Sequence, residues 1–86
     1  MRVYPSSKFS RNFKKLPRDI QERVIERDAI FRANPRDARL DVHKLHGDKK
    51  GEWAYSVDNS YRVTFVVVSS DAVLYTNIGT HDEIYR

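Results

Sequence analysis

Three side chains have the chemistry to act on a phosphate ester. Arg62 stands near the start of a run that is otherwise β-branched or aromatic (61–68), while His43 and His81 lie before and after it. The planar fork of arginine stays charged and offers paired donors to a phosphate. The unperturbed pKa of histidine lies near neutrality, so its ring can take or give a proton. This set indicates an anionic substrate, and RNA fits it best.

Metal-independent cleavage of RNA needs these residue types. A base removes the 2′-hydroxyl proton, a cation stabilises the charge gathering on the phosphate, and an acid protonates the leaving 5′-oxygen. The products are a 2′,3′-cyclic phosphate and a 5′-hydroxyl. Arg62 and His81, the two stronger candidates, can also be explained by structural roles alone. Arg62 can pair with Asp58 or Asp82 at the end of its strand. His81 can cap a helix or pair with Asp82.

The segment 41–50, DVHKLHGDKK, is basic and contains two histidines. We interpret it as an edge strand or extended loop, in which alternation sends His43 and His46 to opposite faces. Only one of them can then serve the site, and we choose His43 as catalytic. The other polar residues are candidates for binding the RNA backbone, although lysines in a glycine-flanked loop are often simply solvated. These candidates are Lys44, Lys49, Lys50 and His46. The His-x-x-His spacing lacks a carboxylate cluster, so we expect no metal and no cofactor.

Aromatic residues near these positions divide between core and site. Trp53 and Tyr55 alternate with small residues in a strand, so core packing is the better interpretation. Tyr85 lies in the C-terminal tail with little core to enter, which makes it the better candidate for stacking on a base. Glu52 is an alternative base, but we interpret it as a surface residue.

Three strand-like runs form the scaffold that presents these residues: 53–57, 61–68 and 72–78. Turn residues join them at 58–60 and 69–71, and connections this short make neighbouring strands antiparallel. We expect the run 61–68 to be a central strand that is covered on both faces over Val66 to Val68. Thr80 or Asp82 can then cap a terminal helical turn.

Two helices precede these strands. Ser6 and Ser7 are good N-cap residues, and an apolar stripe at helical spacing follows them. Pro17 ends the first helix and can begin the second, expected over 17–33, because proline is tolerated in a first turn. Asn34 before Pro35 ends the second helix. The predicted fold is α+β: an N-terminal α-hairpin packed on one face of a small antiparallel sheet, in the order β-α-α-β-β-β-β. The other face is left for a site.

Composition limits the class of protein. The 86 residues make one domain (1–86), and the absence of cysteine excludes a disulfide framework and a thiolate metal site. No apolar run reaches about 20 residues and no signal-peptide pattern is present, so we expect a cytoplasmic protein. Residues 1–50 hold 14 Lys and Arg against 7 Asp and Glu, whereas residues 51–86 hold 2 against 5. This asymmetry favours a nucleic acid or an acidic protein as partner.

Four segments occur in an order and spacing typical of one known family: a helical hairpin broken at KKLP, then HKLHGDKKGEWAYSV, SYRVTFVV and the ending NIGTHDEIYR. Over nearly its whole length the chain resembles the RelE/ParE toxins of bacterial type II toxin–antitoxin pairs, in the YafQ/RelE-like branch of mRNA interferases. The resemblance implies a small antiparallel sheet with two N-terminal helices, an antitoxin protein as partner, and endoribonuclease activity on mRNA at the ribosome, which inhibits translation.

By this resemblance, Arg62 corresponds to the arginine that RelE-like members place against the scissile phosphate. His81 corresponds to a catalytic histidine or arginine, and Tyr85 to an aromatic residue that stacks on or orients the nucleotide. His43 resembles a histidine of YafQ-like members that is a glutamate in others. The sequence departs from RelE itself, whose site is lysine-rich. Two alternatives therefore stay open: a ParE-like toxin that inhibits DNA gyrase by protein binding without ribonuclease activity, and a non-catalytic RNA-binding domain.

Overall fold

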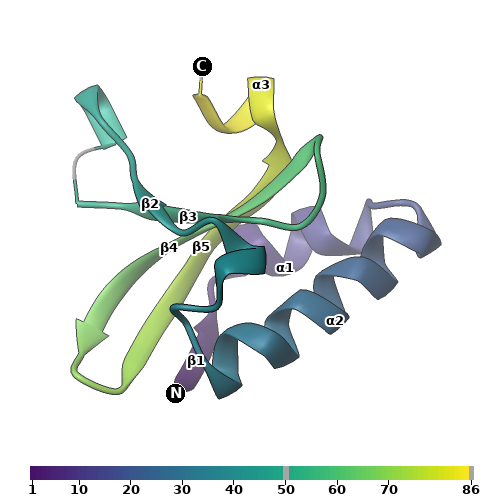
Figure 1. Cartoon of the computed structure of the whole chain (residues 1–86). Helices are drawn as coiled ribbons and strands as arrows, with labels where there is room; N and C mark the ends of the chain where they lie inside the picture. The colour runs from purple at the N-terminus through teal and green to yellow at the C-terminus, as the bar shows by residue number, and fades with distance from the viewer. Residues whose placement is uncertain (50, 86) are drawn as a thin grey trace.

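Five strands form one sheet, in the spatial order β1-β5-β4-β3-β2. The structure, a computed structural model, describes residues 1–49 and 51–85 (Figure 1). Along the chain the elements are β1 (Arg2–Pro5), α1 (Ser7–Lys14), α2 (Arg18–Ala33), the 3₁₀-helix η1 (Ala38–Leu40), β2 (His43–Lys44), the 3₁₀-helix η2 (Gly47–Lys49), β3 (Trp53–Ser56), β4 (Tyr61–Ser69), β5 (Ala72–Thr80) and α3 (His81–Tyr85). The predicted α+β class and the order of its strands and two long helices are confirmed.

The sheet is mixed rather than wholly antiparallel. The pairs β2–β3, β3–β4 and β4–β5 are antiparallel, as the short connections predicted, but β1 runs parallel to β5. The expectation of an entirely antiparallel sheet is wrong for this one pair. No tight turn joins β1 to β5, because most of the chain lies between them, so nothing local forces their directions to oppose.

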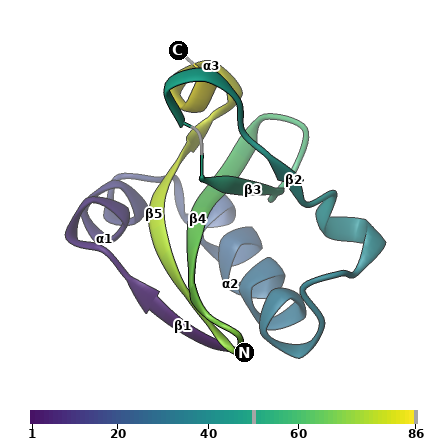
Figure 2. The ribbon, with the colours of Figure 1, turned by 90° about the vertical axis from the view of Figure 1, so that its left-hand side faces the viewer.

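The two N-terminal helices follow their predicted limits closely. The side chain of Ser6 caps α1 by accepting a hydrogen bond of 3.0 Å from the backbone N–H of Phe9. Pro17 is the N-cap of α2, which ends before Asn34. In Figure 2, α2 lies behind the strands, with α1 beside the β1–β5 edge. In the described ranges no helix is long and apolar enough to cross a membrane.

Aromatic rings fill the layer between the helices and the sheet. Phe31 of α2 stacks on Tyr55 of β3 with a centroid distance of 5.0 Å, and both side chains are almost fully buried. The hydroxyl of Tyr55 donates to that of Tyr75 at 3.0 Å, and Tyr75 donates to the Asp28 carboxylate at 2.7 Å. Burial raises the pKa of both phenols, so both remain neutral donors. This chain of bonds ties β3 and β5 to α2.

We expect Tyr75→Phe to lower the free energy of unfolding by about 1–3 kcal/mol, because the buried hydroxyl of Tyr55 loses its acceptor. For a chain of this size that is a fall of several degrees in Tm, on the order of 5 °C for each kcal/mol. Denaturant unfolding followed by circular dichroism measures it. Tyr4→Phe is the matched control, since Tyr4 is 48% exposed. Equal stability of the two variants would show that the buried hydrogen bonds of Tyr75 contribute nothing to the free energy of unfolding.

One predicted strand is less covered than its composition suggested. Val67 and Val68 are 58% and 54% exposed, so the expectation of a strand buried on both faces over Val66 to Val68 is wrong there. The pairing explains the difference. The first residue of β3, Trp53, pairs with Phe65, so β4 continues past the start of β3 and projects as a two-stranded ribbon with β5.

Candidate active site

Strand alternation places His43 and Arg62 on the face of the sheet opposite α1 and α2. Tyr55 points into the core on the helix side, so the flanking residues Ala54 and Ser56 point to the other face. His43 is paired with Ala54, and Arg62 is paired with Ser56. Paired residues carry their side chains on the same face of a sheet. An edge strand and a central strand thus deliver one candidate each to the free face.

The short helix α3 carries the other two candidates, His81 at its first position and Tyr85 at its last. Its start is fixed by a reciprocal cap between two side chains. The backbone N–H of Thr80 donates to Oε1 of Glu83 at 2.7 Å, and the N–H of Glu83 donates to Oγ1 of Thr80 at 3.3 Å. The predicted cap by Thr80 is therefore confirmed.

A small apolar cluster holds α3 on the sheet. Ile84 is 1% exposed and packs with Leu45, just after β2, and with Ala54 of β3. Figure 1 shows α3 at the end of β5, on the side of the sheet away from α2. Since Ile84 precedes Tyr85 directly, this contact also fixes where the phenol lies.

Thr80→Ala should loosen α3, because the mutation removes the acceptor for the Glu83 N–H and typically costs about 1 kcal/mol at a helix N-cap. Amide hydrogen exchange at Glu83 and Tyr85 is expected to accelerate about fivefold, the equivalent of that free energy. Ser70→Ala, in an exposed turn, is the control. Unchanged exchange in α3 would mean that the cap is not what orders it.

His43 makes a defined hydrogen bond through each ring nitrogen. Nδ1 lies 2.9 Å from the backbone carbonyl of Asp41, and Nε2 lies 2.5 Å from the hydroxyl of Tyr85. A carbonyl oxygen can only accept, so Nδ1 carries the proton in the neutral ring. Nε2 is then the acceptor and the Tyr85 hydroxyl is the donor. The planes of the two rings are nearly parallel, with an angle of 10° between them.

His81 also contacts the Tyr85 ring. Its centroid is 4.3 Å from that of Tyr85, with 40° between the planes. Its Nδ1 is 3.6 Å from a carboxylate oxygen of Asp82, and the side chains are 57% and 93% exposed. An ion pair so open to solvent contributes little. Both histidines therefore contact the one phenol, while His81 also faces water.

Arg62 is half-buried, and among the described residues its hydrogen bonds to the protein are made by one terminal nitrogen. Nη1 donates to the backbone carbonyls of Asp58 at 2.7 Å and Tyr61 at 3.0 Å. Carbonyls orient the guanidinium without neutralising its charge. The Asp58 carboxylate instead accepts from the backbone N–H groups of Ser60 and Tyr61. The plainer reading of Arg62 as an ion-pair partner of Asp58 therefore does not describe its contacts.

Electrostatics link Arg62 to the rings. Partial burial raises the pKa of the Tyr85 phenol, the charge of Arg62 opposes this rise, and the carboxylate of Asp41 adds to it. The guanidinium therefore acts on the same phenol that both histidines contact. The four residues predicted to be catalytic come together on one face of the sheet, and their catalytic roles stay predictions.

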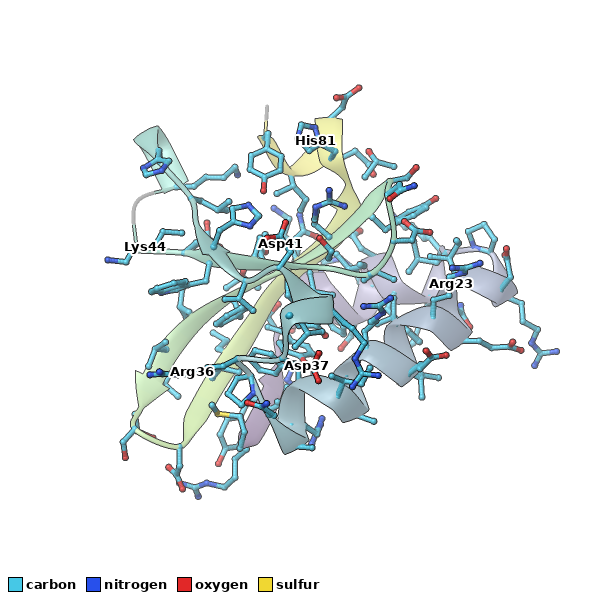
Figure 3. The ribbon with its side chains drawn as sticks, in the orientation of Figure 1. Arg23, Arg36, Asp37, Asp41, Lys44 and His81 are labelled. Atoms are coloured by element: carbon cyan, nitrogen blue, oxygen red, sulfur yellow. The ribbon has the colours of Figure 1, made fainter. Side chains whose placement is uncertain are left out.

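Of the residues predicted to bind the RNA backbone, Lys44 points away from this cluster. Lys44 pairs with Trp53 and holds its ammonium 5.3 Å from that ring centroid, on the opposite face from His43. Figure 3 shows Lys44 at the left margin of the molecule and His81 at the top. The backbone carbonyl of Lys49 accepts from the N–H of Glu52 at 3.0 Å, within the turn after η2. His46 is exposed and lies just after β2. Lys50, the fourth candidate, lies outside the described residues.

Two features of this face were missed by sequence reasoning. Glu52 is half-buried rather than a plain surface residue, because its carboxylate accepts from Thr76 at 2.6 Å and Thr76 in turn bonds Thr64 at 2.7 Å. Asp41 supplies the carbonyl that bonds His43. No signal in the sequence points to this contact, because it is made by a backbone oxygen and not by a side chain. Over residues 1–49 and 51–85, no group of three or more potential ligands is placed to hold a metal ion.

Comparison with known proteins identifies the fold. Neither a protein-family model nor a curated protein sequence matches the chain. Among solved structures, YafQ from E. coli strain BL21(DE3) matches over 100% of both chains, with a TM-score of 0.81 and 16% identity. The YoeB/ParE toxin from Agrobacterium tumefaciens matches with a TM-score of 0.76 and 14% identity, over 94% of this chain and 99% of that one.

An archaeal RelE–RelB complex from Pyrococcus horikoshii OT3 also matches, with a TM-score of 0.71 and 20% identity over 92% of both chains. Identities this low establish similarity of fold, and in these three matches the similarity extends over at least 92% of each chain. The protein therefore has the fold of the YafQ, YoeB/ParE and RelE toxin structures.

Proposed function

We propose that the protein is an endoribonuclease that cleaves mRNA without a metal, by attack of the 2′-hydroxyl on the adjacent phosphate. The observation that carries this proposal is the convergence of Arg62, His43, His81 and Tyr85 on one face of the sheet. They come from β4, β2 and both ends of α3. Two imidazoles and a guanidinium that is held by backbone carbonyls are the groups that the reaction requires.

His43 is the base in this proposal. Its Nε2 carries the lone pair that faces the cluster, and in the free protein that lone pair accepts the Tyr85 hydroxyl. The substrate's 2′-hydroxyl takes the place of the phenol, and its proton passes to Nε2 as the bond from the 2′-oxygen to phosphorus forms. The displaced Tyr85 ring then offers a surface on which a base can stack.

Arg62 stabilises the phosphate as negative charge accumulates. Its Nη1 is already oriented by two backbone carbonyls, so Nη2 and Nε form the edge for the phosphate oxygens. A donor held in place before the reaction pays little reorganisation when the charge develops. His81 gives its proton to the leaving 5′-oxygen as the bond from phosphorus to that oxygen breaks. The products are a 2′,3′-cyclic phosphate and a 5′-hydroxyl.

The biological role we propose is that of a toxin in a type II toxin–antitoxin pair, acting on mRNA at the ribosome. Support comes from the fold, which is shared with toxins solved in the archaeal RelE–RelB complex and in the E. coli DinJ–YafQ complex. The excess of basic residues over 1–50 suits an acidic segment of an antitoxin.

Purified protein incubated with RNA, with and without ribosomes and in the presence of a metal chelator, tests the activity. We expect new fragments that end in a 2′,3′-cyclic phosphate and begin with a 5′-hydroxyl. Arg23→Ala is the matched control for an arginine, because Arg23 is exposed on α2, far from His81 in Figure 3. RNA that stays intact under both conditions, together with inhibition of DNA gyrase, would contradict the proposal in favour of a ParE-like protein.

A further inference from the structure

We propose that Asp41 is a positioning residue: its backbone carbonyl fixes the tautomer of His43 and so makes Nε2 the proton acceptor of the site. The inference rests on the proposed ribonuclease function for its meaning, but the tautomer itself is a property of the free protein. The contact that carries it is the 2.9 Å separation between His43 Nδ1 and the Asp41 carbonyl oxygen.

The direction of this carbonyl depends on an unusual backbone conformation. Asp41 has φ 48° and ψ 51°, in the left-handed region, and it is the one non-glycine residue with positive φ in the part of the chain that the structure describes. Few side chains other than those of glycine, asparagine and aspartate adopt this conformation readily. The turn folds the chain back on itself, so that the carbonyl of Asp41 meets a ring only two residues later.

The residues before Asp41 hold the turn in place. Leu40 is fully buried in the core and thereby anchors η1 to the sheet. Nη1 of Arg27, on α2, donates to the carbonyl of Arg39 at 2.7 Å. Asp37 caps η1 by accepting from the N–H of Arg39, and the Arg39 side chain holds the pKa of Asp37 at about 2, so the cap stays ionised at neutral pH. The carbonyl of Asp41 therefore projects from a fixed point.

This carbonyl, and not Tyr85, decides the tautomer. A phenol can donate or accept, so the Tyr85 hydroxyl can pair with either form of Nε2. A carbonyl can only accept, so the 2.9 Å contact requires a proton on Nδ1. When Nε2 then takes a proton from substrate, the same bond stabilises the resulting imidazolium, because a hydrogen bond to a charged donor is stronger than to a neutral one. A bond from one carbonyl thus serves both the resting and the charged ring.

Three substitutions separate the carbonyl from the aspartate side chain. Asp41→Asn and Asp41→Gly remove the carboxylate but keep residues that adopt positive φ readily. Asp41→Val keeps a carbonyl but disfavours the left-handed conformation, so the carbonyl turns away. Tyr85→Phe removes the other partner of the ring and leaves the carbonyl contact untouched.

The tautomer is read directly by two-dimensional NMR of ¹⁵N-labelled protein, in which the ring nitrogens of protonated and unprotonated type have distinct shifts. We expect the Nδ1–H form of His43 in wild type, Asp41→Asn, Asp41→Gly and Tyr85→Phe, and a mixture in Asp41→Val. In RNA cleavage, Asp41→Asn and Asp41→Gly should stay within about threefold of wild type. Asp41→Val should lose about tenfold or more in kcat with little change in KM, as misplaced catalytic groups do.

The Nε2–H form of His43 in wild type would overturn the proposal, as would full retention of the Nδ1–H form and of cleavage in Asp41→Val. If Asp41→Val does not fold, the proposal is decided by the tautomer of His43 in wild type and by whether Asp41→Gly keeps that tautomer and its cleavage activity. A wild-type protein that shows the Nδ1–H form but cleaves no RNA would contradict the ribonuclease function while supporting the tautomer assignment, so the two failures are distinguishable.

Discussion

Replacing Arg62 by alanine is expected to lower kcat/KM for RNA cleavage by about 10²–10³-fold, the loss typical of removing one preorganised donor to a developing oxyanion. The physical reason is that Arg62 carries its charge onto the free face of the sheet, oriented by the carbonyls of Asp58 and Tyr61. Arg62→Lys keeps the charge but loses the planar fork, so we expect an intermediate loss of about tenfold or more. Single-turnover cleavage of a short RNA measures both variants.

Two comparisons guard this prediction against a trivial cause. Arg62→Ala also removes two hydrogen bonds, one to the turn before β4 and one to the first residue of β4, so its unfolding transition must be measured alongside its activity. Arg23→Ala removes an equally charged but exposed residue of α2 and should cleave like wild type. If Arg23→Ala and Arg62→Ala lose activity equally, Arg62 acts only through the net charge of the protein. The proposed contact between Arg62 and the phosphate is then wrong.

Removing either histidine of the cluster should slow cleavage by about 10²–10⁴-fold, the range of general acid–base catalysis. His43→Ala and His81→Ala are expected to look alike on ordinary RNA. They separate on an RNA whose leaving 5′-oxygen is replaced by sulfur, because a thiolate leaves without being protonated. We expect His81→Ala to recover most of its activity on that substrate, whereas His43→Ala, which lacks the base, recovers none.

The reverse pattern, with recovery in His43→Ala alone, would exchange the two roles. It would also remove the catalytic meaning of the bond between Asp41 and His43. His46→Ala is the matched control for a histidine, since His46 is exposed and the ring contacts of Tyr85 in the described part of the chain are with His43 and His81. A loss in His46→Ala as large as in His43→Ala would contradict the assignment of His43 to the site.

Local signals in the sequence predicted the helices and the antiparallel hairpins. Ser6 caps the first helix, Pro17 separates it from the second, and turn residues separate the three long strands. Each of these signals acts between residues that are close in sequence. The parallel pairing of β1 with β5 joins the two ends of the chain, and no local pattern announces it. The exposure of Val67 was missed for a similar reason, since composition does not show where a neighbouring strand begins.

The site shows the same division. Residue chemistry and the family resemblance selected Arg62 and His43, but whether they share a face depends on the register of β2 against β3. A strand of two residues carries no periodicity from which to read that register. The same register turns Lys44 toward Trp53, away from the cluster. The carbonyl of Asp41 was out of reach of sequence reasoning, because residue type does not reveal where a backbone oxygen points.

Mapping of mRNA 5′ ends in bacteria after induction of the protein tests the central claim most directly. Wild type, Arg62→Ala and His81→Ala would be compared at equal expression, with Arg23→Ala as the control. We expect new 5′-hydroxyl ends within translated codons in wild type and Arg23→Ala, lost in the other two. Growth arrest with intact transcripts, unchanged in Arg62→Ala and His81→Ala, would contradict the ribonuclease account and favour inhibition of gyrase.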